Sequence, residues 1–417
     1  MRIGYLQLSP QQTHESGIVR YARYIAQAVA ALPEVEVQTI ALPLDPRTPF
    51  QAPLQRALED LRACDVLHLQ YSKYLGLSGW NMLKLLKTIR RQSTGKLCIT
   101  LHDVYVDLYP AYGLLDAWKF ENKRLRGYSN QQSLALRSTA TCLWQNHLAD
   151  KAVMQWILNH ADQVLTCSQT EAERLQHFDN VAKVTVIPHF IETRAEVLPV
   201  AAAKQALGFK ATDTLITLQG FIYRSKGHAL LLEALSLLPN SVQLAFAGGM
   251  APNQTDLQRE LEAQIQRLGL GDRVRITGHL SEPDLECYLA ASDLGVCPFQ
   301  IISASGTLST WISMGRPVLA YDLPQVEELN QRVPGAIATF LDYTPESLAE
   351  AIETCLVQPA KTPLVQQLQE KLSLAHIAQL HGAVYAAPSQ PALTRPTPSV
   401  PSTAEPRIGR VPRNADS

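Results

Sequence analysis

The sequence predicts an α/β protein built from two doubly wound parallel-sheet, Rossmann-like domains that face each other across a cleft. Short apolar runs of strand length alternate with helical patterns, an arrangement typical of parallel sheets with right-handed crossovers. This alternation runs through the first half of the chain and begins again near residue 213. With 417 residues, 46% of them hydrophobic, the chain can bury two cores. We therefore expect a first domain over residues 1–195 and a second over 196–363.

The first series contains six predicted strands. They are expected at MRIGYLQL, VEVQTIAL, DVLHLQY, KLCITLHD, ADQVLTCS and KVTVIPHF. The first helix, about 18–32, is indicated by apolar residues at helical spacing, namely Ile18, Tyr21, Ile25, Val29 and Leu32. Further helices are expected at about 52–63 and 80–91, and residues 110–160 have a long helical pattern with no clear strand.

The second series also contains six predicted strands. They are expected at TLITLQG, VQLAFAGG, RVRITGHL, LGVCPF, PVLAYD and GAIATFLD. Ser281, followed three residues later by Asp284, resembles a capping box that opens a helix running to Ala291. Ligands of doubly wound sheets bind beyond the carboxyl ends of the strands. The small and charged residues that follow these strands are therefore the candidate site.

Composition excludes several classes of function. A formal net charge of −1 argues against a nucleic-acid binder. Residues 1–190 carry a small excess of cations, which suggests an anionic partner such as a lipid surface or a phosphorylated acceptor, although solvated charge is the simpler explanation. The seven cysteines show no CxxC spacing, so we expect small core residues in a reducing compartment and no metal site.

The two ends of the chain and its apolar runs indicate where the protein resides in the cell and which segment is flexible. The N-terminus is too short and too polar for a signal peptide, and no apolar run is long enough to span a membrane. We expect a cytoplasmic protein that is at most peripheral on the inner face of the membrane. Residues 387–417 contain seven prolines and no aromatic residue, which predicts a flexible tail without a catalytic role.

Two loops of the first domain follow predicted strands. His14 to Gly17 precede a helix and leave backbone N–H groups free for an anion, but Ser16 could equally be a simple helix cap. His102 ends the strand KLCITLHD, where it could contact or deprotonate a hydroxyl. A structural histidine is the competing interpretation, and His68 and His189 occupy similar positions.

Two loops of the second domain have the composition of phosphate sites. The loop from Gly220 to Gly227 holds Arg224 and Lys226 between glycines, and this pair of cations suits a diphosphate unless both are merely solvated. The small residues Ser305 to Thr307 lie where a strand feeds a helix, so backbone N–H groups and the helix dipole could hold phosphate. Glycines at such turns can also serve only the turn.

In order, these patterns resemble family 4 of the retaining glycosyltransferases, which have the GT-B fold. The segments that carry the resemblance are SGIVRYARYIAQAVA, TLHD, VTVIPHF, GFIYRSKG, AFAGG, ITGHL and SGTLSTWISMGRPVLA, covering roughly residues 1–385. The resemblance implies transfer of a hexose from a nucleotide-diphosphate sugar, as co-substrate, to a hydroxyl of a glycan or lipid-linked acceptor in cell-surface polysaccharide or glycolipid synthesis. It also implies no metal and no other cofactor. A final helix, about 364–385, would cross back onto the first, acceptor-side domain.

The resemblance assigns roles by position. Catalytic roles fall on His102, at the donor sugar, and on Arg224 and Lys226, which would neutralise the leaving diphosphate. The residues implied at the donor and its phosphates are Gly17, Gly220, Ser305, Gly306 and Thr307. Those implied at the base are Gly278, His279 and Leu280.

Two departures from the family pattern affect these assignments. Members usually carry two glutamates eight positions apart, but Ile302 and Thr310 occupy those positions here, so ribose recognition must differ. The arginine usual after the glycine of the cation loop is replaced by Phe221. A catalytically silent, glycosyltransferase-like binding protein is therefore the alternative. A nucleotide-sugar epimerase is less favoured because no early GxGxxG is present, and a phosphorylase because no lysine context for pyridoxal stands out.

A membrane contact is a further hypothesis. In residues 80–91, Leu83, Leu86 and Ile89 gather near one helical face and the cations on another, and a second basic cluster follows at 119–126. Both could meet an anionic leaflet. A helix that merely covers a sheet has the same pattern.

Overall fold

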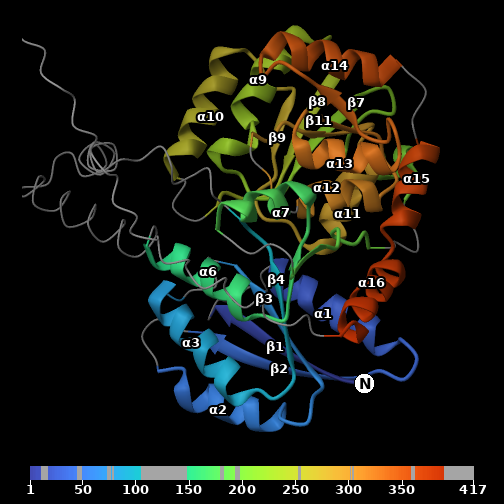
Figure 1. Ribbon diagram of the computed structural model, residues 1–417. Helices are drawn as coiled ribbons and strands as arrows, with labels where there is room; N and C mark the ends of the chain where they lie inside the picture. Colours follow the sequence, from blue (N-terminus) through green and yellow to red (C-terminus); the bar gives the residue numbers. More distant parts are fainter. Residues whose placement is uncertain are drawn as a thin grey trace, which may run out of the picture.

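The computed structural model describes residues 1–10, 17–44, 49–72, 77, 79–104, 148–178, 183–192, 198–251, 255–300, 302, 305–357 and 362–388. Two all-parallel six-stranded sheets form the two domains, as the sequence predicts (Figure 1). The basic cluster 119–126, residues 389–417 and most of the segment 110–160 lie outside the described residues, as do His14 and Ser16.

The N-terminal sheet has the strand order β2-β1-β3-β4-β5-β6. Its strands are β1 (Arg2–Pro10), β2 (Glu36–Leu44), β3 (Val66–Tyr71), β4 (Lys96–Leu101), β5 (Gln163–Thr166) and β6 (Val184–Val186). Every residue of β3 and β5 is buried, as expected for parallel strands covered on both faces. One face packs against α2 (Gln51–Asp60), α3 (Gly79–Gln92) and α6 (Asp150–His160). A short helix, α7 (Gln169–Leu175), follows β5.

The C-terminal sheet has the order β12-β11-β10-β7-β8-β9. Its strands are β7 (Thr214–Gln219), β8 (Val242–Ala247), β9 (Val274–Ile276), β10 (Leu294–Cys297), β11 (Val318–Tyr321) and β12 (Ala338–Phe340). Its helices are α8 (Val200–Ala206), α9 (His228–Leu237), α10 (Thr255–Arg267), α11 (Glu282–Ala291), α12 (Gly306–Ser313), α13 (Pro324–Arg332) and α14 (Pro345–Val357). Ser281 caps α11, as its spacing to Asp284 predicts: its side chain accepts a hydrogen bond from the Asp284 N–H at 3.3 Å.

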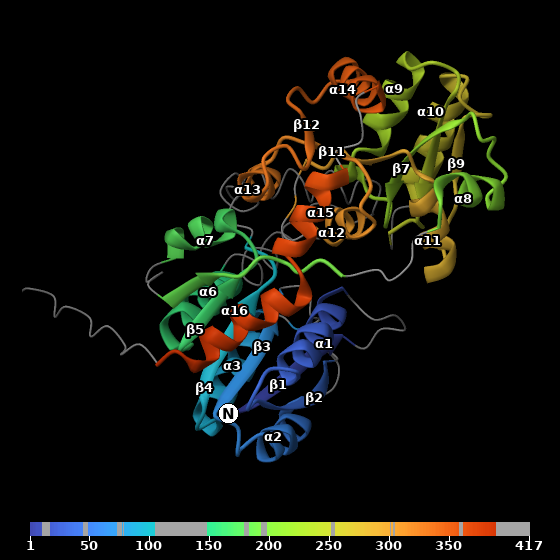
Figure 2. The ribbon, with the colours of Figure 1, turned by 90° about the vertical axis from the view of Figure 1, so that its right-hand side faces the viewer.

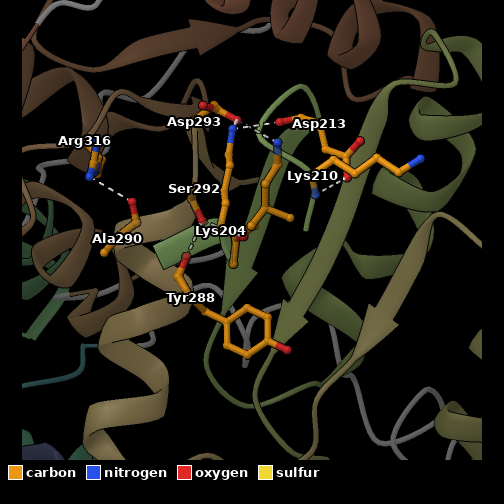
Figure 3. A network of polar contacts seen from close by, with 10 residues as sticks. Lys204, Lys210, Asp213, Tyr288, Ala290, Ser292, Asp293 and Arg316 are labelled. Carbon is orange, nitrogen blue, oxygen red and sulfur yellow. Dashed lines mark hydrogen bonds and ion pairs between the residues drawn. The ribbon is translucent and has the colours of Figure 1, made fainter. Parts of the chain in front are cut away.

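A buried lysine ties α8 to this sheet (Figure 3). Lys204 Nζ lies 2.6 Å from Asp293 Oδ2 and donates to the carbonyl oxygen of Asp213 at 2.7 Å. The same Asp293 oxygen accepts from the Leu215 N–H at 2.7 Å. The charge of Lys204 is therefore compensated, and its stem can pack in the interior.

The chain returns to the N-terminal domain at its end. The segment 364–385, expected as a single helix, is instead two: α15 (Thr362–Lys371) and α16 (Leu374–Ala386). The break occurs because Ser373 caps α16, accepting from the His376 N–H at 3.4 Å, while Leu372 is buried beside it. Figures 1 and 2 show α16 beside α1 (Gly17–Ala30), and both helices cover the second face of the N-terminal sheet.

Candidate active site

A cavity of about 370 Å³ lies between the two domains. The N-terminal domain contributes Gly17, Arg20, Tyr21, His189, Phe190 and Glu192 to its lining. The C-terminal domain contributes residues that follow β7, open α11 and open α12, including Phe221, Glu282, Gly306 and Thr307. The cavity therefore faces the carboxyl end of β7, where ligands of such sheets bind.

Lys226 is the central cation of the loop after β7. Its side chain is buried, and Gly220 lies so close that an added Cβ would sit 2.5 Å from Lys226 Nζ and 3.3 Å from Thr307 Oγ1. The ammonium group thus lies near the first turn of α12. Burial lowers the pKa of Lys226 to about 8, and among the described residues no carboxylate forms an ion pair with it. A buried cation of this kind favours an anionic ligand, which would restore the lost solvation.

The first turn of α12 provides a second feature suited to an anion. Ser305 caps the helix by accepting from the Leu308 N–H at 3.1 Å. Gly306 and Thr307 follow and line the cavity, and no atom occupies the space where a Gly306 Cβ would be. A helix N-terminus open in this way, with a buried cation beside it, is suited to bind phosphate.

The two cations of the loop diverge. Arg224 and Lys226 lie in one 3₁₀ turn, in which residues two apart point in different directions. The exposed Arg224 guanidinium forms two bonds of 2.6 Å to Glu260 on α10 and borders a different cavity of about 110 Å³. Its partner, Glu260, is 36 residues away in sequence, so the pattern RSK alone gave no sign of this pairing. The structure does not bring Arg224 to the side of Lys226.

His102 directly follows β4 and is buried, and it is not among the residues that line the cavity. Its ring meets the edge of Tyr21 at a centroid distance of 4.9 Å, and Tyr21 lines the cavity. His102 Nε2 lies 2.7 Å from Gln70 Oε1. Burial, helped by nearby His189, lowers the pKa of His102 to about 3, so the ring is neutral at physiological pH.

Comparison with known proteins places the chain in a family. Residues 15–195 match the protein family described as "Glycosyltransferase Family 4", and residues 213–358 match the family described as "Glycosyl transferases group 1". Together the two matches span both domains that form the cavity. The chain belongs to glycosyltransferase family 4 and has the GT-B fold.

Curated family members resemble part of the chain. A D-inositol 3-phosphate glycosyltransferase of Xylanimonas cellulosilytica is 27% identical over 169 residues, 38% of this chain and 40% of the relative. An alpha-D-kanosaminyltransferase of Streptomyces kanamyceticus is 29% identical over 143 residues, 34% of this chain and 36% of the relative. The matched regions are thus two fifths or less of those relatives' length.

Solved structures confirm the GT-B fold across both domains. Sucrose-phosphate synthase from Thermosynechococcus elongatus aligns with a TM-score of 0.65 at 20% identity, covering 92% of this chain and 98% of that one. HepE of Anabaena, in complex with UDP, aligns with a TM-score of 0.64 at 17% identity, covering 92% and 99%. At these identities the likeness shows the fold alone.

The remaining family-derived positions differ in where they lie relative to the cavity. Gly17 lines it directly. Gly278 has a φ of +72°, and the loop after β8 packs close to His279, where an added Cβ on Gly249 would lie 3.2 Å from the His279 nitrogen. Neither His279 nor Leu280 is among the lining residues, although Glu282 and Leu285 from the same segment are.

The two positions where the family usually has glutamate carry no charge. Ile302 is buried, while Thr310 lines the cavity and turns its hydroxyl back to the Gly306 carbonyl at 2.8 Å. Phe221, where the family usually has arginine, also lines the cavity. The family's usual carboxylates are therefore replaced by an apolar residue and a hydroxyl.

Sequence reasoning missed Arg20, which lies one turn after Gly17 on α1. Its guanidinium lies 2.9 Å from Glu192 and 3.3 Å from Glu282, so it joins α1 to the connecting segment and to the opposite domain. The only available signal was its helical spacing from Gly17, which places both on the cavity side.

Glu328 on α13 forms a second contact between the domains and was also missed. Its carboxylate accepts from the Gln169 N–H at 2.7 Å, and from the N–H and hydroxyl of Thr170 at 2.8 and 2.7 Å. A carboxylate of one domain therefore occupies the N-terminus of α7 in the other, where the helix dipole favours it. No local pattern announces a partner 158 positions away.

Proposed function

We propose that this glycosyltransferase moves a hexose from a nucleotide-diphosphate sugar to a hydroxyl of a glycan or lipid-linked acceptor, with retention of configuration and without a metal. The observation that carries the proposal is the buried Lys226, which forms no ion pair with a carboxylate of the described residues, beside the open first turn of α12. Cell-surface polysaccharide or glycolipid synthesis is the class of process that would use such a transfer.

In the proposed reaction, the bond between the anomeric carbon and the diphosphate oxygen breaks, and its electron pair leaves with the diphosphate. Lys226 and the α12 N-terminus stabilise the charge that develops there, which takes the place of a metal. The acceptor oxygen attacks the same face, and its proton passes to the departing phosphate oxygen. The cavity carboxylates Glu192 and Glu282 are held by Arg20, which argues against either as a covalent nucleophile.

A catalytically silent binding protein remains the second candidate, favoured by Ile302 and Thr310 at the usual glutamate positions. A thermal-shift screen of UDP, GDP, ADP, CDP and TDP, followed by a transfer assay with the matching sugar donors, tests both candidates. The proposed enzyme gives stabilisation by one diphosphate and acceptor-dependent release of it, with the product anomer identified by NMR. Binding without release on any acceptor favours the silent protein, and no binding by wild type refutes both.

Membrane contact is proposed in a narrower form than the sequence pattern suggested. The apolar face of α3 is packed in the N-terminal core, with Leu83, Leu86 and Ile89 buried, so it cannot insert into a bilayer. The exposed cations of this helix, Lys84, Lys87 and Arg91, remain to meet an anionic leaflet. Among the described residues, no helix is long and apolar enough to cross a membrane.

Co-sedimentation with vesicles tests this contact. Binding to anionic but not neutral vesicles is expected. High salt should weaken it, and so should charge reversal at Lys84, Lys87 and Arg91. Protein that stays in the supernatant with anionic vesicles at low salt would point to a soluble acceptor.

A further inference from the structure

A network of buried hydrogen bonds leads away from His102 along the face of the N-terminal sheet that α1 and α16 cover. Gln70, at the end of β3, lies between two histidines: its Oε1 is 2.7 Å from His102 Nε2, and its Nε2 is 3.3 Å from His68 Nε2. His68 Nε2 is also 2.8 Å from the hydroxyl of Thr100. All four side chains are buried, so these groups have few alternative partners.

This hydrogen-bond network continues into α16, the last helix of the described residues. His68 Nδ1 lies 2.5 Å from the hydroxyl of Tyr385 on α16. The same hydroxyl lies 2.7 Å from the hydroxyl of Tyr5 on β1 and 3.2 Å from His381 Nδ1. Tyr385 is separated from His68 by 317 positions in sequence, and only the return of α16 to the first domain brings them together.

With the oxygen of the Gln70 amide toward His102 and its nitrogen toward His68, the direction of each bond follows. Burial lowers the pKa of His102 to about 3 and that of His68 well below its usual value, so each ring carries one N–H. The Gln70 oxygen can only accept, so the proton of His102 is on Nε2. The Gln70 amide nitrogen can only donate, so Nε2 of His68 carries a lone pair. The proton of His68 is then on Nδ1 and is donated to Tyr385.

We propose that Gln70, His68 and Tyr385 are positioning residues that hold the proton of His102 on Nε2 and leave its Nδ1 as a lone pair for a substrate hydroxyl. The inference rests on the proposed function, because it assumes that His102 meets substrate. It deepens that function by making α16 part of the active-site machinery. The ring of His102 would then accept a hydrogen bond from a sugar or acceptor hydroxyl rather than donate one.

An opposite arrangement of the same chain explains why Tyr385 matters. If the Gln70 amide turned over, His68 would donate from Nε2 and His102 would carry its proton on Nδ1, where it could no longer accept from substrate. His68 Nδ1 would then need a donor. The Tyr385 hydroxyl, 2.5 Å from His68 Nδ1, accepts in the proposed arrangement and would have to donate in the opposite one, so the direction of its proton is coupled to the tautomer of His68.

The test compares two variants that each remove one hydroxyl from the same buried cluster. Tyr385→Phe breaks the chain at His68, whereas Tyr5→Phe removes a neighbour of Tyr385 and leaves that link intact. Histidine-selective ¹⁵N labelling with long-range ¹H–¹⁵N spectra reports which nitrogen of His102 is protonated, with the signal assigned from a His102→Gln sample. The wild type should show the proton on Nε2. Tyr385→Phe should give a mixture of both forms, and Tyr5→Phe should match the wild type.

Turnover is the second readout. Tyr385→Phe should lower kcat several-fold at nearly unchanged donor KM, and Gln70→Met, which breaks the link next to His102, should lower it further. The proposal is overturned if His102 keeps its proton on Nε2 in both Tyr385→Phe and Gln70→Met. It is also overturned if Tyr5→Phe changes the protonated nitrogen of His102 as much as Tyr385→Phe does. A changed ring with unchanged turnover instead refutes the role of His102 in the proposed function. The ring measurement stands even if no donor is found.

Discussion

Replacing Lys226 by Met should stabilise the unliganded protein while destroying its affinity for a nucleoside diphosphate. Lys226 is 3% exposed, and burial lowers its pKa from 10.5 to about 8. A depression of that size corresponds to about 3 kcal/mol of differential solvation. Methionine has a similar length and flexibility without the charge, so it can fill the same space.

The pH dependence of the free energy of unfolding follows from the different proton affinities of Lys226 in the folded and unfolded protein. The folded protein loses the Lys226 proton near pH 8, whereas the unfolded chain keeps it until about 10.5. Below pH 8 the buried charge therefore costs the folded state about 3 kcal/mol, and the free energy of unfolding should rise as pH increases from 8 to 10.5. At pH 7, Lys226→Met should be more stable than the wild type by up to about 3 kcal/mol. Its free energy of unfolding should not show the increase between pH 8 and 10.5.

Denaturant unfolding between pH 7 and 10.5 measures the stability, and calorimetry measures the affinity. Losing one charge-assisted contact should weaken diphosphate binding by roughly ten- to a hundredfold. The matched control is Lys204→Met, which removes a similarly buried lysine that pairs with the partly exposed Asp293 and should destabilise by about 1–3 kcal/mol. If Lys226→Met lowers stability and leaves affinity unchanged, Lys226 is a structural cation and the diphosphate site is elsewhere.

Three further changes test the neighbouring geometry. Arg224→Ala should leave diphosphate affinity within about twofold of wild type by calorimetry, because its guanidinium is held by Glu260 outside the cavity; a tenfold loss would show that this pair opens on binding. Gly227→Ala should lower the free energy of unfolding by about 2–4 kcal/mol in denaturant unfolding, since φ is +85° and the new Cβ would overlap a carbonyl oxygen. Gly271→Ala, whose new Cβ meets no atom within 4 Å, should lower it by less than about 1 kcal/mol. Equal losses in the two variants would contradict the backbone strain at Gly227. Glu328→Ala should free the N-terminus of α7 and raise the radius of gyration in small-angle scattering, and an identical scattering curve would mean that this contact does not hold the domains together.

The elements were predictable where the signal was local. Alternating apolar runs predicted both parallel sheets, and Ser281 with Asp284 predicted the start of α11 because a cap involves neighbours in sequence. Lys226 was predicted as a phosphate-binding residue from its flanking glycines, and the structure places its ammonium group near Thr307, which lines the cavity. Arg224 was grouped with it because composition does not reveal direction. The break at Ser373 was missed because the apolar pattern continues through it into α16.

Contacts between distant segments were beyond the sequence. Nothing near Glu328 indicates that its carboxylate lies at the start of α7, and nothing near Arg20 indicates that Glu192 and Glu282 hold it. Their partners are chosen by the packing of two domains, which no periodicity within one segment encodes. The hydrogen bonds of Tyr385 fall in the same class.

The return of α16 to the N-terminal sheet has a consequence for how the protein is made. Tyr5 and His68 are buried beneath a helix that leaves the ribosome only after the whole second domain. At about 5–20 residues per second, the stretch from β6 to α16 takes on the order of 10–40 s to synthesise. During that time the face of the sheet beside α1 lacks its cover. The N-terminal domain thus completes its folding last although it is synthesised first, and nascent chains ending before Leu374 should be the ones that chaperones and proteases recognise.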